Sequence, residues 1–192
     1  MGPAKDDLSS ATASRTRALD RLNADFEGLY ALVYRYLLHR FFDPELAEEL
    51  TAQTFYNAAT HLSHRNGDIR QIRVWLLRTA TNLANTHYRR NRLRQLFLRQ
   101  SARSRPTPTE PRSAPDSASG QRLARVRGVL LALRPKYQTV VVLRYYAQMP
   151  YDDIAEVLGC RPDAVRARLS RATREMRERL GPEEPDAVSE GD

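Results

Sequence analysis

The sequence predicts an all-α protein made of two small helical domains, joined by a flexible linker that is rich in proline and serine. Three observations predict this class. Apolar residues recur at helical spacing through two stretches, about residues 17–99 and 121–180. Residues 100–120 between them hold four prolines among Ser, Thr and Ala and show no hydrophobic pattern. No stretch alternates polar and apolar residues as a half-buried strand does.

The composition excludes several other classes of protein. The chain has 192 residues, of which 41% are hydrophobic, so it can build a core and is not wholly disordered. Its one cysteine, Cys160, excludes an internal disulfide and a cysteine-based zinc finger. The apolar runs are too short to span a membrane, and the N-terminus lacks a secretory signal, so a cytoplasmic protein without membrane insertion is expected. The four histidines share no metal-ligand spacing, so neither a metal nor a cofactor is expected.

The first domain is expected to contain three helices. Apolar spacing predicts the first helix over about residues 17–40. Asp43 and Pro44 end that helix and start the next, over about residues 44–62. The reason is that Asp43 can accept from first-turn N–H groups and proline suits the first helical position. Asn66-Gly67-Asp68 then predicts a turn, after which a long arginine-rich helix is expected over about residues 69–99.

Four more helical segments are expected after the linker. They cover about residues 121–133, 135–147, 151–158 and 162–180.

The last two segments have the spacing of a helix-turn-helix motif. Gly159 lies between them and can adopt the positive φ that a helix exit often needs. Val165 and Leu169 form the inward stripe of the second helix. Arginines lie off that stripe and can reach guanine edges or phosphate oxygens. The alternative is an ordinary pair of helices with solvated arginines.

Basic residues are concentrated in two blocks. Residues 65–105 carry 11 arginines and one acid, and residues 121–180 carry 13 basic against six acidic residues. Residues 181–192 carry five acids and form an acidic tail. Two basic blocks suggest a polyanion bound at two places. The alternative is that each basic helix merely presents a solvated face.

These motifs together resemble bacterial RNA polymerase sigma factors of the extracytoplasmic-function group (group IV). DPELAEELTAQTFYNA (43–58) is similar to the family pattern D-x-x-x-A-E-D-L-x-Q-E-x-F. IRVWLLRTATNLANTHYRRNR (72–92) is similar to F-R-x-W-L-x-x-I-A-x-N-x-x-x-D-x-x-R-R. Residues 130–180 resemble the family's L-P-x-x-x-R-x-V-x-L-R pattern and the helix-turn-helix that follows it.

The resemblance implies a domain organisation and a function. Residues 17–99 would form sigma region 2, residues 100–120 the linker, and residues 121–180 sigma region 4, followed by the tail at 181–192. Such a factor has no catalytic residue. It binds core RNA polymerase, directs it to promoters and helps open the DNA. Its expected partners are core polymerase, promoter DNA and, as in many relatives, an anti-sigma factor, with no small-molecule substrate. The two domains are expected to act through the linker without packing tightly.

The resemblance also implies which region 2 residues touch these partners. The surface for core polymerase would be Glu45, Glu48, Glu49 and Gln53. Region 2 would capture one strand of the minus-ten element as single-stranded DNA, and aromatic and arginine side chains suit unstacked bases. The DNA-binding positions would be Ser63, His64, Arg65, Asn66, Arg78, Asn82, Tyr88, Arg89 and Arg90. Trp75 lies in the apolar stripe, so we expect it to pack in the core.

Region 4 would read the minus-thirty-five element in the major groove. By position, Arg166, Ala167, Ser170 and Arg171 would face bases, and Arg161, Asp163, Ala164 and Arg168 would lie near the DNA backbone. A carboxylate repels phosphate, so Asp163 has the alternative of accepting a hydrogen bond from a cytosine amino group.

Two other classes of function remain as alternatives. A stand-alone helix-turn-helix regulator would usually carry a dimerisation element or a ligand-binding domain, and the sequence indicates neither. A nuclease using carboxylates would need a facing base, but the acids of residues 43–58 lie along one surface with no His or Lys opposite.

Overall fold

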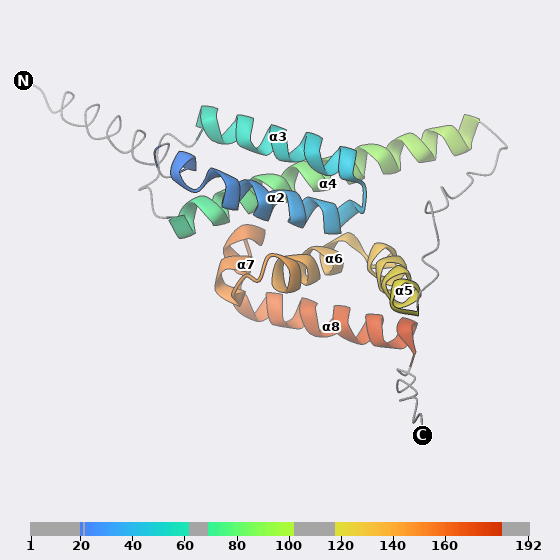
Figure 1. Ribbon diagram of the computed structural model, residues 1–192. Helices are drawn as coiled ribbons and strands as arrows, with labels where there is room; N and C mark the ends of the chain where they lie inside the picture. Colours follow the sequence, from blue (N-terminus) through green and yellow to red (C-terminus); the bar gives the residue numbers. More distant parts are fainter. Residues whose placement is uncertain (1–19, 21, 62–68, 102–117, 182–192) are drawn as a thin grey trace, which may run out of the picture.

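The structure is a computed structural model that describes residue 20 and residues 22–61, 69–101 and 118–181 (Figure 1). Every regular element in this part of the chain is helical, so the predicted fold class is confirmed. None of its helices is both long and apolar enough to cross a membrane. In chain order the elements are α2 (Phe26–Phe41), α3 (Pro44–His61), α4 (Ile69–Ser101), α5 (Ala118–Ala132), α6 (Pro135–Val141), the π-helix η1 (Val142–Tyr146), α7 (Tyr151–Leu158) and α8 (Pro162–Leu180).

Helices α2, α3 and α4 form the first bundle (Figure 1). The predicted boundary at Asp43 is confirmed, because its Oδ1 accepts the backbone N–H of Leu46 at 3.1 Å. The helix expected over about residues 17–40 is interrupted, because residues 20 and 22–24 are helical, Asp25 forms a turn, and α2 begins at Phe26. The turn predicted at residues 66–68 and most of the predicted linker lie outside the described residues.

Helices α5 to α8 form the second bundle, and it departs from the sequence prediction at one point. The single helix expected over residues 135–147 changes at Val142 into a π-helix. The N–H of Ala147 bonds to the carbonyl of Val142, five residues back, at 3.1 Å. The next residues leave the helix, with Gln148 at φ 52° and Met149 almost fully buried. The wide turn therefore brings Met149 into the core.

The helix-turn-helix prediction is confirmed. Gly159 has φ 60°, and its N–H reaches the carbonyl of Glu156 at 3.3 Å. The N–H of Cys160 bonds to the carbonyl of Ala155 at 3.0 Å, which closes the end of α7 in the way typical of a left-handed cap. Val165 and Leu169 are buried on α8.

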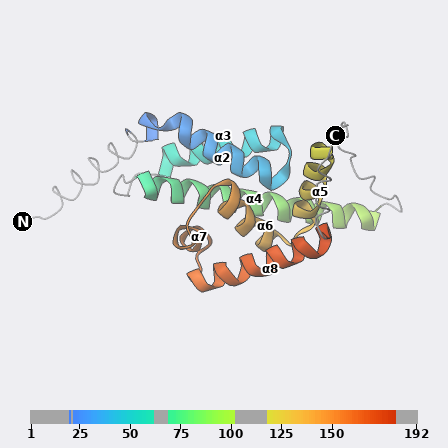
Figure 2. The same cartoon turned by 60° about the horizontal axis from the view of Figure 1, so that its bottom comes forward.

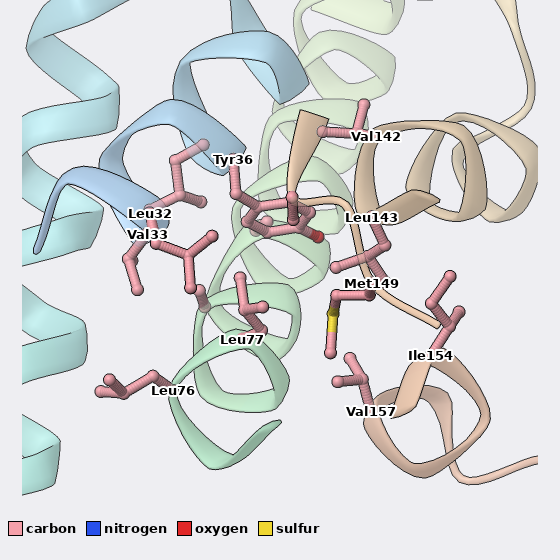
Figure 3. Packing of buried hydrophobic residues seen from close by; sticks show 14 of the residues in the cluster. Leu32, Val33, Tyr36, Leu76, Leu77, Val142, Leu143, Met149, Ile154 and Val157 are labelled. Atoms are coloured by element: carbon pink, nitrogen blue, oxygen red, sulfur yellow. The ribbon is translucent and has the colours of Figure 1, made fainter. Parts of the chain in front are cut away.

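The two bundles pack directly against each other, so the expectation that they do not pack tightly is wrong. Helix α4 contacts α7, and α2 contacts η1 (Figures 1 and 2). Tyr36 of α2, Leu77 of α4 and Met149 of the segment between η1 and α7 are buried in one continuous core (Figure 3). The physical reason is that the two bundles present apolar surface to each other, and burying such surface stabilises at roughly 25 cal/mol per Å².

A buried polar pair also joins the bundles. Arg40 at the end of α2 is 3% exposed, and its Nη1 donates to Oε1 of Gln138 on α6. In return, Nε2 of Gln138 donates to the Arg40 carbonyl at 2.8 Å. These bonds offset part of the free-energy cost of burying the Arg40 charge, whose Nε has no hydrogen-bond partner among the described residues.

Candidate polymerase and nucleic-acid interfaces

Helix α3 presents an acidic face to solvent. The four residues of the expected polymerase surface, Glu45, Glu48, Glu49 and Gln53, are all exposed. The opposite side of the same helix buries Ala47, Thr54 and Ala58 against the first bundle. The structure therefore brings the four side chains together on one free surface, which suits a basic partner.

From residue 82 onward, α4 exposes aromatic and arginine side chains. Tyr88 is 43% exposed, and Asn82, Arg89 and Arg90 are also exposed. Nη2 of Arg89 donates to Oγ1 of Thr86 at 3.3 Å. An exposed tyrosine can stack on an unpaired base, and exposed arginines on the same helix can neutralise phosphates. The expected core position of Trp75 is confirmed, since it is half-buried against the hydrophobic core.

Arg78 does not join that surface. It is half-buried, and its Nη2 donates to the backbone carbonyl of Glu156 at the end of α7. A cation is favourable there because carbonyl groups at a helix C-terminus carry partial negative charge. The remaining region 2 positions, Ser63, His64, Arg65 and Asn66, lie outside the described residues.

On the second helix of the motif, α8, Arg166 contacts two neighbouring side chains. Its Nη1 lies 2.7 Å from Oδ1 of Asp163, and its guanidinium lies 5.5 Å from the ring centroid of Tyr151. Asp163 therefore pairs with Arg166 in this structure, and both side chains are exposed. The other expected base-facing residues, Ala167, Ser170 and Arg171, are exposed, as is Arg161, whereas Ala164 and Arg168 are half-buried.

Sequence reasoning missed two features of these surfaces. Tyr151 was not expected to touch Arg166, and Arg70 was not expected to pair with Asp153 across the two bundles. The available signal was the two adjacent acids, Asp152 and Asp153, within a basic domain. The partner of Asp153, however, lies 83 residues away in the sequence.

A helix-turn-helix bundle and an arginine-lined bundle in one chain define a two-part DNA-binding protein. Comparison with known proteins identifies its kind. The family model for Sigma-70 region 2 matches residues 26–94, and the model for Sigma-70, region 4 matches residues 123–176. These matches cover both bundles in the order expected from the sequence.

Named relatives and a solved structure agree. RNA polymerase sigma factor YlaC of Bacillus subtilis is 28% identical over 84% of this chain and 92% of that protein. ECF RNA polymerase sigma factor BldN of Streptomyces coelicolor is 27% identical over 88% of this chain, which spans 62% of that longer protein. In fold, the chain resembles sigma factor RpoE of Bartonella quintana, solved in complex with the anti-sigma factor NepR. The TM-score is 0.64 at 18% identity, covering 85% of this chain and 98% of that one.

The chain belongs to the sigma-70 family of RNA polymerase sigma factors, in its extracytoplasmic-function group.

Proposed function

We infer that this chain directs core RNA polymerase to specific promoters and helps open their DNA to initiate transcription. The observation that carries this conclusion is the presence of region 2 and region 4 in one chain, with the helix-turn-helix in the second. A stand-alone regulator would have no use for region 2, so that alternative is set aside.

The acidic face of α3 is the proposed docking surface for core polymerase. Its support is that Glu45, Glu48, Glu49 and Gln53 are exposed together, whereas the rest of the helix is held by α2 and α4. Paired charges across such an interface mainly set the rate and specificity of association.

The two basic surfaces are the proposed DNA contacts. Helix α4 binds the unpaired DNA strand of the minus-ten element through Asn82, Tyr88, Arg89 and Arg90. On α8, Arg166 and Arg171 read bases of the minus-thirty-five element in the major groove. The exposure of these side chains and the orientation of Arg166 by Asp163 support the assignment.

The protein acts by binding alone, with no catalytic residue of its own, in the cytoplasm where polymerase and chromosome meet. An anti-sigma factor is a further proposed partner. Its support is the fold shared with a sigma factor that was solved bound to one.

Co-purification tests this function. The purified chain is mixed with core RNA polymerase from the same bacterium and separated by size-exclusion chromatography. We expect the chain to elute with the polymerase in equal amounts. Elution of all the chain at its own monomer position would contradict the proposal.

A further inference from the structure

Tyr151, the first residue of α7, lies beside two guanidinium groups. Its ring centroid is 5.0 Å from Cζ of Arg144 in η1 and 5.5 Å from Cζ of Arg166 on α8. Both distances fall within the range of about 6 Å over which an aromatic ring attracts a cation. One ring therefore connects the segment before the helix-turn-helix with the second helix of the motif.

The ring of Tyr151 belongs to a packed part of the fold. Tyr151 is half-buried and packs against the hydrophobic core. Its neighbour Arg144 is also half-buried, and Nη1 of Arg144 donates to the carbonyl of Met149 at 2.9 Å. Met149 is itself 2% exposed, so this bond ties Arg144 to a buried segment. Tyr151 thus presents a fixed aromatic surface at the start of α7.

Arg166, by contrast, is open to solvent. Its side chain is 58% exposed, and that of its ion-pair partner Asp163 is 78% exposed. An ion pair so open to water contributes little to holding a side chain in place. A long exposed side chain samples many rotamers, whereas a bidentate contact with a base requires one orientation. The contact with Tyr151 ties the Arg166 guanidinium to a packed part of the fold.

We propose that Tyr151 is a positioning residue, whose ring orients Arg166 for reading the minus-thirty-five element and stays against its guanidinium when DNA binds. This proposal rests on the proposed base-reading role of Arg166. A side chain that is oriented before binding loses less conformational entropy when it meets its partner. A cation–π contact at an exposed site corresponds to about a two- to fivefold change in an equilibrium constant. Tyr151 therefore sharpens sequence preference rather than adding general affinity.

Selection of promoters by the polymerase complex tests this role. The chain is combined with core RNA polymerase, and active sequences are selected from a library randomised over the minus-thirty-five element. Tyr151→Leu removes the ring but keeps an apolar side chain, whereas Tyr151→Phe keeps the ring and removes the hydroxyl. Tyr145→Leu is the matched control, because Tyr145 is a tyrosine of η1 that is 57% exposed. Arg166→Ala identifies the base pairs that Arg166 reads.

We expect Tyr151→Leu to weaken preference about two- to fivefold at the base pairs that Arg166→Ala affects, and at no others. Tyr151→Phe and Tyr145→Leu should select the same sequences as the wild type. In an Arg166→Ala background, Tyr151→Leu should change the selected sequences no further, because the two side chains act through one contact.

Several results would overturn the proposal. An unchanged preference in Tyr151→Leu would show that the ring does not guide Arg166. Equal activity loss on all upstream sequences would leave Tyr151 with a structural role only. A defect in Tyr151→Phe as large as that in Tyr151→Leu would transfer the role to the hydroxyl group. An unchanged preference in Arg166→Ala would remove the base contact that Tyr151 is proposed to guide.

The wild-type complex separates this proposal from the proposed function. If it selects no upstream sequence, the proposed function fails, and the positioning role fails with it. If it selects a sequence that Tyr151→Leu leaves unchanged, only the positioning role fails.

Nuclear magnetic resonance tests the contact in the free chain, without polymerase. An aromatic ring shifts the resonance of a proton held beside it, and the Nε–H signal of Arg166 is assigned by its disappearance in Arg166→Lys. We expect Tyr151→Phe to keep the position of this signal and Tyr151→Leu to move it. A signal that stays in place in Tyr151→Leu would overturn the proposal. Circular dichroism checks folding, and if Tyr151→Leu is not helical, Tyr151→Met replaces it in both experiments with the same expectations.

Discussion

His39 stacks on Tyr146 with their ring centroids 3.8 Å apart and their planes inclined by 29°. The contact joins α2 of the first bundle to η1 of the second. Nδ1 of His39 is buried and has no hydrogen-bond partner among the described residues. Burial, and secondarily the positive charge of Arg35, lower the pKa of His39 below 6.5. The packed state therefore favours the neutral ring.

Acid should weaken the folded, packed state through this histidine. His39 binds a proton more readily in the unfolded chain than in the folded protein. The free energy of unfolding therefore falls as the pH drops below about 6.5. We expect His39→Phe, which keeps an aromatic ring but cannot titrate, to lose less stability between about pH 7.5 and pH 5.5. Urea unfolding at several pH values measures this. If the free energy of unfolding changes with pH in the same way for both proteins, His39 does not contribute to the pH dependence of stability.

The buried contact between the bundles should contribute substantially to stability. Leu77 is 0% exposed and lies in the core shared by α4, α2 and α7 (Figure 3). Leu77→Ala should lower the free energy of unfolding by about 2–5 kcal/mol through lost burial and a cavity. Leu93→Ala, at a 54% exposed position of the same helix, should change it by less than about 0.5 kcal/mol. Similar losses for both variants in chemical denaturation would refute the shared core.

Reversing charge on α3 should weaken polymerase binding. The double variant Glu48→Arg and Glu49→Arg keeps a helical surface but turns attraction for a basic partner into repulsion. Its control is Glu27→Arg with Asp152→Arg, which makes the same change of charge at exposed positions outside α3. We expect at least a tenfold loss of affinity for core polymerase, on the order of 1.4 kcal/mol, in the α3 variant only. Equal co-purification of the two double variants would place the docking surface elsewhere.

Arg166 should carry sequence information rather than general affinity. A bidentate contact with a base is worth roughly 1–3 kcal/mol of discrimination, so Arg166→Ala should relax preference at particular base pairs. Asp163→Asn should relax the same positions to a smaller extent, because it loosens the 2.7 Å contact that orients the guanidinium. Arg90→Ala should weaken all sequences alike, as loss of a phosphate contact does. Selection from a randomised promoter library measures the three profiles.

A uniform loss of affinity for Arg166→Ala, with no change in the selected upstream sequence, would make Arg166 a phosphate contact. Base reading would then belong to Arg171 or Arg168.

Local chemistry made part of this structure predictable. Asp43 caps α3 and Gly159 closes α7 because each depends on neighbours within a few residues. The π-helix could not be foreseen, since the apolar spacing of residues 135–147 fits an α-helix equally well. The packing of the two bundles depends on which apolar faces remain after each bundle forms, and a helical periodicity does not carry that information.

The candidate site residues were also predictable from the sequence only in part. The exposure of the α3 residues and of most α8 residues follows from helical periodicity, whereas Ala164 and Arg168 are half-buried. The partner of Arg78 is a carbonyl 78 residues away in the other bundle, and no local pattern names it. Its assignment to the DNA surface therefore stays a prediction.

In vitro transcription tests the central claim most directly. Core RNA polymerase from the same bacterium is incubated with fragmented genomic DNA, with and without this protein, and the 5′ ends of the transcripts are sequenced. We predict that the protein creates a set of new start sites that share two sequence elements upstream, and that Arg166→Ala alters only the farther element. Identical start sites with and without the protein, in a reaction where it co-purifies with polymerase, would contradict its role as a sigma factor.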